Sequence, residues 1–240
     1  MLDEVVSRLP AGWRPRPGPL VDHLVSWVVG GAGGRVRRLH LVYADARRLL
    51  RTTERHEALA VLENHLAQAV AEMAPRRLFV HAGVVGWNGR AILVPGASHA
   101  GKSTLVAALL AAGATYYSDE YAVLDPQGRV HPFPRPLRLR DASEVATSVE
   151  PERLGGRRGL GPLPVGLVAV ARYDRGARWR PARLTPGRAL LELLSHTIVA
   201  RSHPATAMTM LRRVVSRAPS FKGRRGEAEE TAAWLLEAVG

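Results

Sequence analysis

The stretch "VPGASHAGKSTL" (94–105) constrains this chain more than any other, because it matches the phosphate-loop pattern. Four residues separate Gly96 from the run Gly101, Lys102 and Ser103. The lysine is informative, since the chain has only two lysines among its 34 basic residues and otherwise uses arginine. A compact ammonium on a flexible stem fits within such a loop, whereas a planar guanidinium does not fit in the same way.

The sequence on either side of the loop predicts the strand and the helix that a phosphate loop needs. Residues 90–96, "RAILVPG", have the aliphatic and β-branched composition of a buried strand, and residues 102–113 have that of a helix ended by a glycine. Backbone N–H groups of the loop would then face the phosphates, with Lys102 at the outer phosphates and the Ser103 hydroxyl on Mg²⁺. The predicted ATP-binding residues are Gly96, Ala97, Ser98, His99, Ala100, Gly101, Lys102, Ser103 and Thr104.

The composition restricts the class of protein. The 240 residues are 46% hydrophobic, which supports a substantial core. They include no cysteine, which excludes a disulfide framework, a thiolate nucleophile and a cysteine metal site. No apolar run approaches the length of a membrane span, and the N-terminus lacks the pattern of a signal peptide. We therefore expect a cytoplasmic protein without a membrane partner.

The net charge of +13 favours anionic partners such as nucleotides, acidic peptide segments or nucleic acid. The arginines stand in separate short clusters, the aromatic content is 5%, and no nucleic-acid-reading motif is present. These features disfavour nucleic acid as the partner. A solvated arginine-rich surface is an equally good reading of the charge.

The chain is expected to contain two regions. Residues 1–75 should form a small α+β region, and residues 76–240 a phosphate-loop domain. Within the first region, residues 1–35 are rich in proline and glycine and are predicted to be irregular. Residues 35–53 then predict a hairpin, and residues 54–74 a helix with apolar side chains at helical spacing.

The second region predicts an α/β fold with a mixed, hairpin-rich sheet and C-terminal helices. Residues 77–85 and 90–96 are apolar runs joined by "GWNG", whose Asn-Gly step is a strong hairpin signal. The strand that enters the loop should therefore have an antiparallel neighbour, unlike the strands of a parallel sheet, which need helical crossovers. Further hairpins are predicted at 120–133 and 166–184, and helices at 186–199, 204–218 and 226–239.

An acidic pair follows the predicted loop helix. Asp119 and Glu120 stand 17 residues after Lys102, at the end of a hydrophobic approach. A Mg²⁺ ligand or a general base would sit at such a place beside a phosphate loop. The alternative is a solvated acidic pair without a role.

The segment from "VHAGVV" to "YYSDEYAVLD" resembles the catalytic core of the HPr kinase/phosphorylase family and its shorter relatives. It shares the His81-Ala82 step before the loop, the loop itself and the acidic pair, which is Asp-Asp in the family and Asp119-Glu120 here. The resemblance covers roughly residues 78–140 and is weaker beyond. It implies a phosphate-loop domain of the HPr kinase/phosphoenolpyruvate carboxykinase type, and an enzyme that uses ATP and Mg²⁺ to phosphorylate a serine hydroxyl of a protein.

The resemblance also implies roles for residues. Asp119 would be the catalytic base, Lys102 and His81 would act at the phosphates, and Ser103 and Glu120 would hold the metal. Some short relatives phosphorylate a ribosomal precursor peptide, which implies a protein or peptide partner bearing a serine. The family often forms hexamers, which implies a homo-oligomer.

Several alternatives remain open at this point. The chain could be a nucleotide-binding or nucleotide-hydrolysing switch without kinase chemistry, although the absence of an Asn-Lys-x-Asp motif favours ATP over GTP. His81 could be a core histidine, and His99, where the family usually has glycine, is expected to point to solvent. His196 and His203 are expected to be structural. Three arginines, Arg135, Arg138 and Arg140, alternate along an extended segment, so they either steer an anionic substrate or form a solvated face.

Overall fold

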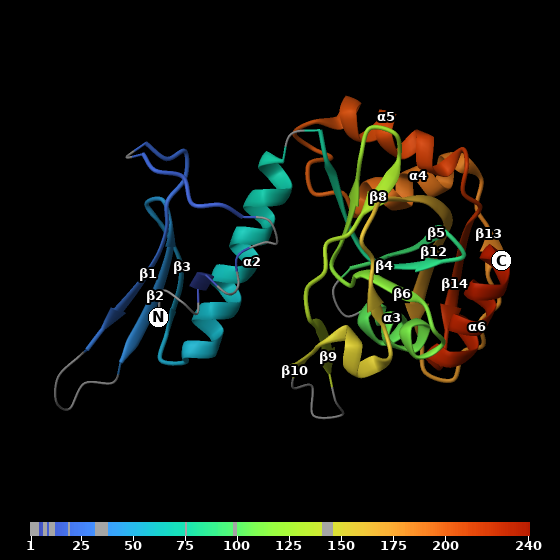
Figure 1. Ribbon diagram of the computed structural model, residues 1–240, viewed down its shortest axis with the longest axis horizontal. Helices are drawn as coiled ribbons and strands as arrows, with labels where there is room; N and C mark the ends of the chain where they lie inside the picture. The colour runs from blue at the N-terminus through green and yellow to red at the C-terminus, as the bar shows by residue number, and fades with distance from the viewer. Residues whose placement is uncertain are drawn as a thin grey trace. The chain divides into compact units, whose positions relative to one another are not determined.

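The fold is described by a computed structural model (Figure 1) for residues 5–6, 9, 13–18, 20–31, 38–74, 76–97, 100–140 and 146–240, without the side chains of residues 140 and 146. It divides into two compact units, Met1–Met73 and Ala74–Gly240. The elements of the first are β1 (Val25–Gly30), β2 (Leu39–Ala44), β3 (Arg47–Thr52) and α2 (Arg55–Met73). The elements of the second are β4 (Leu78–Trp87), β5 (Arg90–Pro95), α3 (Lys102–Ala111), β6 (Thr115–Ser118), β7 (Tyr121–Leu124), β8 (Arg129–His131), β9 (Leu137–Arg140), β10 (Ala146–Val149), η1 (Pro151–Leu154), β11 (Arg157–Arg158), β12 (Leu163–Tyr173), β13 (Ala182–Arg183), α4 (Pro186–Ser195), α5 (Pro204–Val215), β14 (Ser220–Arg225) and α6 (Ala228–Val239).

The first unit is an antiparallel sheet in the order β1-β2-β3, with α2 packed against it. Val42 of the sheet and Ala58 and Leu62 of the helix form its buried centre. The predicted hairpin and helix are confirmed. The expectation that residues 1–35 are irregular is wrong for β1, because the apolar, β-branched run "VSWVVG" pairs with β2 along its whole length.

The strand that enters the predicted phosphate loop has the expected antiparallel neighbour. Strands β4 and β5 pair from Ala82↔Pro95 to Trp87↔Arg90. The two residues between them, Asn88 and Gly89, have φ of 47° and 73°. Positive φ at both central positions is what a type I′ turn requires, and Asn-Gly meets it at low cost. The predicted hairpin of β7 and β8 is also present.

The sheet of the second unit is mixed, and helices cover both of its faces. Its central strands run in the order β11-β6-β4-β5-β12-β14-β13, while β7 and β8 link the start of β4 to the start of β12. Helices α4 and α5 pack on one face and α3 and α6 on the other (Figure 1). The fold class is therefore α/β, as predicted. No helix in the described ranges is long and apolar enough to cross a membrane.

The predicted hairpin at 166–184 is wrong. Strand β13 pairs antiparallel with β14, not with β12, and β14 lies between them, parallel to β12. The prediction failed because "SFKGRR" (220–225) has few of the apolar residues that mark a central strand, and its partners lie far away in the sequence. The C-terminal helices are interrupted by this strand, and α4 is shorter than predicted, ending at Ser195.

Candidate functional site

The sheet brings the phosphate loop and the acidic pair to the same edge. Strands β5 and β6 lie on opposite sides of β4 and both run antiparallel to it. Their last residues, Pro95 and Ser118, stand opposite Ala82 and Val84 of β4. The loop that follows β5 and the carboxylates that follow β6 are therefore neighbours, as in sites built at the carboxyl ends of strands.

Backbone hydrogen bonds tie both segments to the His-Ala step of β4. The Gly96 N–H donates to the His81 carbonyl at 3.3 Å, and the Ala82 N–H donates to the Glu120 carbonyl at 3.1 Å. Residues 81 and 82 thus set the spacing between the start of the loop and the acidic pair. This gives the His-Ala step a structural role that does not depend on the imidazole.

The lysine of the loop is buried, with 7% of its surface exposed. Its Nζ donates to the carbonyls of Gly96 and Ala97 at 2.9 and 2.8 Å. Burial lowers the pKa of Lys102 to about 8, although the charges of Asp119 and Glu120 oppose this shift. The Lys102 ammonium is bonded to carbonyls and only partly solvated. Phosphate oxygens could therefore replace those carbonyls as its hydrogen-bond acceptors.

The remaining predicted loop residues are placed around this lysine. Gly101 has φ of 81° and caps α3, so the first turn of α3 carries Lys102, Ser103 and Thr104. A side chain at Gly96 would be tightly packed, since a Cβ there would lie 3.2 Å from the Cβ of Ala100. Ser98 and His99 lie outside the described residues.

Asp119 accepts hydrogen bonds mainly through one oxygen. Its Oδ2 accepts from the Ser103 hydroxyl at 3.0 Å and from the Arg138 N–H at 3.2 Å. The Tyr116 hydroxyl lies 3.4 Å from Oδ1 but only 2.6 Å from the Arg135 carbonyl, and its single proton serves the shorter contact. Oδ1 therefore keeps capacity to accept a proton. Burial raises the pKa of Asp119 against the effect of these hydrogen bonds.

Glu120 faces a cation. Its Oε2 accepts from Nη1 of Arg135 at 2.8 Å, and both side chains are largely buried. Of the three alternating arginines, Arg135 therefore pairs with Glu120, and Arg138 donates its backbone N–H to Asp119 while its side chain is exposed. The side chain of Arg140 lies outside the description.

A histidine that sequence reasoning treated as structural comes close to the site. The His196 carbonyl accepts from the His81 N–H at 2.7 Å, because the chain after α4 returns to β4. Burial lowers the pKa of His81 to about 4, and the charges of Lys102 and His196 add to this effect. The pKa of His196 is lowered in the same way. No local signal marks this contact, whereas His203 is exposed, beside Ser202.

The donor set suits a metal that is shared with phosphates. Among the residues described, no group of three or more histidine, aspartate or glutamate side chains could hold a metal by itself. Mg²⁺ in phosphoryl-transfer sites needs only one or two protein oxygens, because the substrate phosphates and water supply the others. The Ser103 hydroxyl and the Asp119 carboxylate are hard oxygen donors in contact with each other, so they fit that requirement.

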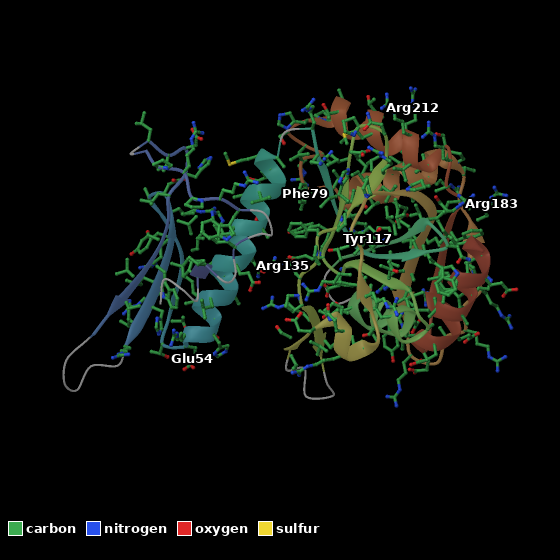
Figure 2. All side chains as sticks on the ribbon, in the orientation of Figure 1. Glu54, Phe79, Tyr117, Arg135, Arg183 and Arg212 are labelled. Atoms are coloured by element: carbon green, nitrogen blue, oxygen red, sulfur yellow. The ribbon has the colours of Figure 1, made fainter. Side chains whose placement is uncertain are left out.

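The positive charge of the second unit is spread over its surface. Figure 2 shows Arg183 of β13 and Arg212 of α5 on separate parts of that surface, while Phe79 and Tyr117 lie inside.

Comparison with known proteins gives no function for these residues. No protein-family model matches the chain, and no curated protein is significantly similar to it. The chemistry must therefore be judged from the phosphate loop, the acidic pair and the contacts between them.

Proposed function

We propose that the protein is a kinase that transfers the γ-phosphoryl group of Mg-ATP to a serine hydroxyl of a protein or peptide. The observation that carries the proposal is the hydrogen bond from Ser103, in the first turn after the loop, to Asp119 at 3.0 Å. It joins the predicted metal ligand and the predicted base in one site. The antiparallel hairpin of β4 and β5 supports a phosphate-loop domain of the HPr kinase/phosphoenolpyruvate carboxykinase type, whose sheet is mixed.

The loop positions the phosphates of ATP. Backbone N–H groups at the start of α3 would face them, where the helix dipole favours negative charge. Lys102 then leaves the carbonyls of Gly96 and Ala97 for phosphate oxygens. His81 stays neutral at pH 7, because its pKa is about 4, so it can donate a hydrogen bond without adding charge.

Asp119 acts as the general base through Oδ1. A serine hydroxyl is protonated at neutral pH, so its proton must leave as the oxygen bonds to phosphorus. Asp119 takes that proton, and the electron pair of the broken bond between the β,γ-bridging oxygen and phosphorus leaves with ADP. The protonated carboxyl can then donate to the Tyr116 oxygen, 3.4 Å from Oδ1.

The Ser103 hydroxyl and the other oxygen of Asp119 would hold the metal. When bound, Mg²⁺ neutralises the charge that develops on the transferring phosphates. Glu120 remains a proposed further metal carboxylate, and Arg135 limits the negative charge that it brings to the pair.

The proposal extends to partners and location. The acceptor is a serine in a protein or an extended peptide, and ATP and Mg²⁺ imply a cytoplasmic setting. A homo-oligomer remains part of the proposal through the resemblance to HPr kinases.

The test is transfer of radiolabelled γ-phosphate to a serine peptide library, with a library that has alanine in place of serine as the control. We expect the parent to label only the serine library. Lys102→Ala should lose ATP affinity by at least tenfold. Asp119→Asn should abolish transfer and leave ATP affinity within a few-fold of the parent.

Two results would count against the proposal. Near-parental transfer by Asp119→Asn would remove the base from the mechanism. Release of free phosphate alone, with every serine acceptor tested, would favour the nucleotide switch instead.

A further inference from the structure

The phosphate loop has a second neighbour, opposite the acidic pair. In the sheet order β6-β4-β5-β12-β14, the loop leaves β5, the acidic pair follows β6 on one side, and β12 and β14 lie on the other. Because β5, β12 and β14 are parallel, their carboxyl ends share the edge where the loop begins. A triphosphate whose reacting end faces Asp119 therefore has its other end toward β12 and β14.

Two side chains stand at that position. Tyr173 and Arg225 are register partners at the ends of β12 and β14. Alternate residues of a strand share a face, and Ala171 packs in the core beneath α3 and α6. Tyr173 is therefore on the α3 face of the sheet, at the edge where α3 begins.

Both residues are fixed to the second half of the loop. The Tyr173 N–H donates to the Ala100 carbonyl at 3.4 Å, and Nη2 of Arg225 donates to the Gly101 carbonyl at 2.6 Å. A Cβ on Gly101 would lie 3.2 Å from the Cβ of Tyr173. The backbone and the Cβ of Tyr173 thus lie beside the residues that lead into Lys102.

The ring of Tyr173 has a cation beside it, and the residue remains exposed to solvent. The Arg225 guanidinium lies 5.4 Å from the ring centroid, and Arg225 itself is 1% exposed. Tyr173 nevertheless keeps 44% of its surface exposed, although Ala171 on the same face of the strand is buried. Its neighbours Arg224 and Asp174 neutralise each other in an ion pair at 2.9 Å. An exposed aromatic ring with a rigid cation behind it suits a flat aromatic ligand.

We infer that Tyr173, backed by Arg225, is the platform on which the base of the nucleotide stacks. The inference rests on the proposed nucleotide site and adds the subsite for the nucleoside. Stacking accepts every base, because each has a π face, and the larger purines gain more overlap than the pyrimidines. ATP should therefore bind more tightly than CTP.

The test is calorimetry with Mg-ATP and with inorganic tripolyphosphate, which has the phosphates but no base. Tyr173→Ala should weaken ATP binding about tenfold, and leave tripolyphosphate binding unchanged. Tyr173→Phe should bind both like the parent, because it keeps the ring. Met208→Ala, which truncates a side chain of α5 that is 48% exposed, is the matched control and should change neither.

The outcomes separate this inference from the proposed function. Unchanged ATP affinity in Tyr173→Ala, while Lys102→Ala still loses affinity, would overturn the platform and leave the phosphate site standing. An equal loss for ATP and tripolyphosphate would also overturn it, because Tyr173 would then act through the loop. A parent protein that binds neither compound would refute both.

Discussion

The Ser103 hydroxyl donates to Asp119 Oδ2 at 3.0 Å, so the residue that should ligate Mg²⁺ is bonded to the carboxylate beside it. The Ser103 oxygen has two lone pairs, so it can ligate a metal while its proton stays bonded to Asp119. Through this hydrogen bond, a metal bound to Ser103 would act on Asp119, the carboxylate that we propose as the base.

The first prediction concerns the dependence of ATP affinity on Mg²⁺. Ser103→Ala removes one of the proposed metal ligands, so Mg²⁺ should strengthen ATP binding much less than it does in the parent. Affinity measured in excess chelator should stay within a few-fold of the parent, because the backbone and Lys102 remain. The measurement is calorimetry with and without Mg²⁺. Ser103→Thr keeps a hydroxyl, as phosphate loops allow, and is the matched control. A full Mg²⁺ effect in Ser103→Ala would exclude Ser103 as a ligand.

The second prediction concerns pH. The pKa of Lys102 in the free protein is about 8, and bound phosphates favour its charged form. Below pH 8 the ammonium is already present, and above pH 8 binding must take up a proton. ATP affinity should therefore fall as pH rises from 8, by up to about tenfold per pH unit. Lys102→Met should bind weakly, with no such fall. Proton uptake at pH 8.5, read from binding enthalpies in two buffers, would be absent if Lys102 does not titrate there.

Local features of the sequence could be predicted, and long-range contacts could not. The hairpin of β4 and β5 follows from an Asn-Gly step between two apolar runs, and α3 follows from helical composition ended by a glycine. The contact of His81 with His196, by contrast, depends on where the chain returns after α4. Nothing near His196 in the sequence carries that information.

In the candidate site, too, local features could be predicted from the sequence and long-range contacts could not. The loop and the acidic pair were predicted from residue types and spacing. The contacts of His196 with His81 and of Arg225 with Gly101 were not predicted, because the segments that make them meet only in the fold. Arg225 is 124 residues from Gly101, and strand β14, which brings it there, has too polar a sequence to be recognised as an inner strand.

The third prediction concerns the packing of α3 on β4. A Cβ on Gly83 would lie 2.6 Å from Cγ2 of Val106 in α3. Gly83→Ala should therefore lower the free energy of unfolding by about 1–3 kcal/mol, the usual cost of overpacking. Gly187→Ala is the control, since a Cβ there meets nothing within 4 Å.

A double-mutant cycle tests the reason for this loss. Val106→Ala removes the methyl group that a Cβ at Gly83 would meet, so Gly83→Ala should cost less in that background. Chemical denaturation of the four proteins gives the coupling. Equal costs in both backgrounds would show that the clash with Val106 is not the cause.

The last prediction separates stability from function at Arg225. This side chain is 1% exposed, and in the described part of the chain no carboxylate forms an ion pair with it. It donates instead to the carbonyls of Gly101 and Gly226. Burial of the charge lowers the pKa of Arg225 and costs free energy that the two carbonyls only partly offset. Gly101 O would keep a partner without Arg225, since the Leu105 N–H also donates to it.

Arg225→Met keeps much of the volume and removes the buried charge, so its free energy of unfolding should stay within about 1 kcal/mol of the parent. Its ATP affinity should nevertheless fall about tenfold, because Gly101 loses the charge-assisted hydrogen bond that fixes the residue before Lys102. Denaturation and calorimetry on the same preparation check both halves. A variant that unfolds far more easily would show that Arg225 stabilises the whole unit. Full ATP affinity would show that the loop keeps its conformation without Arg225.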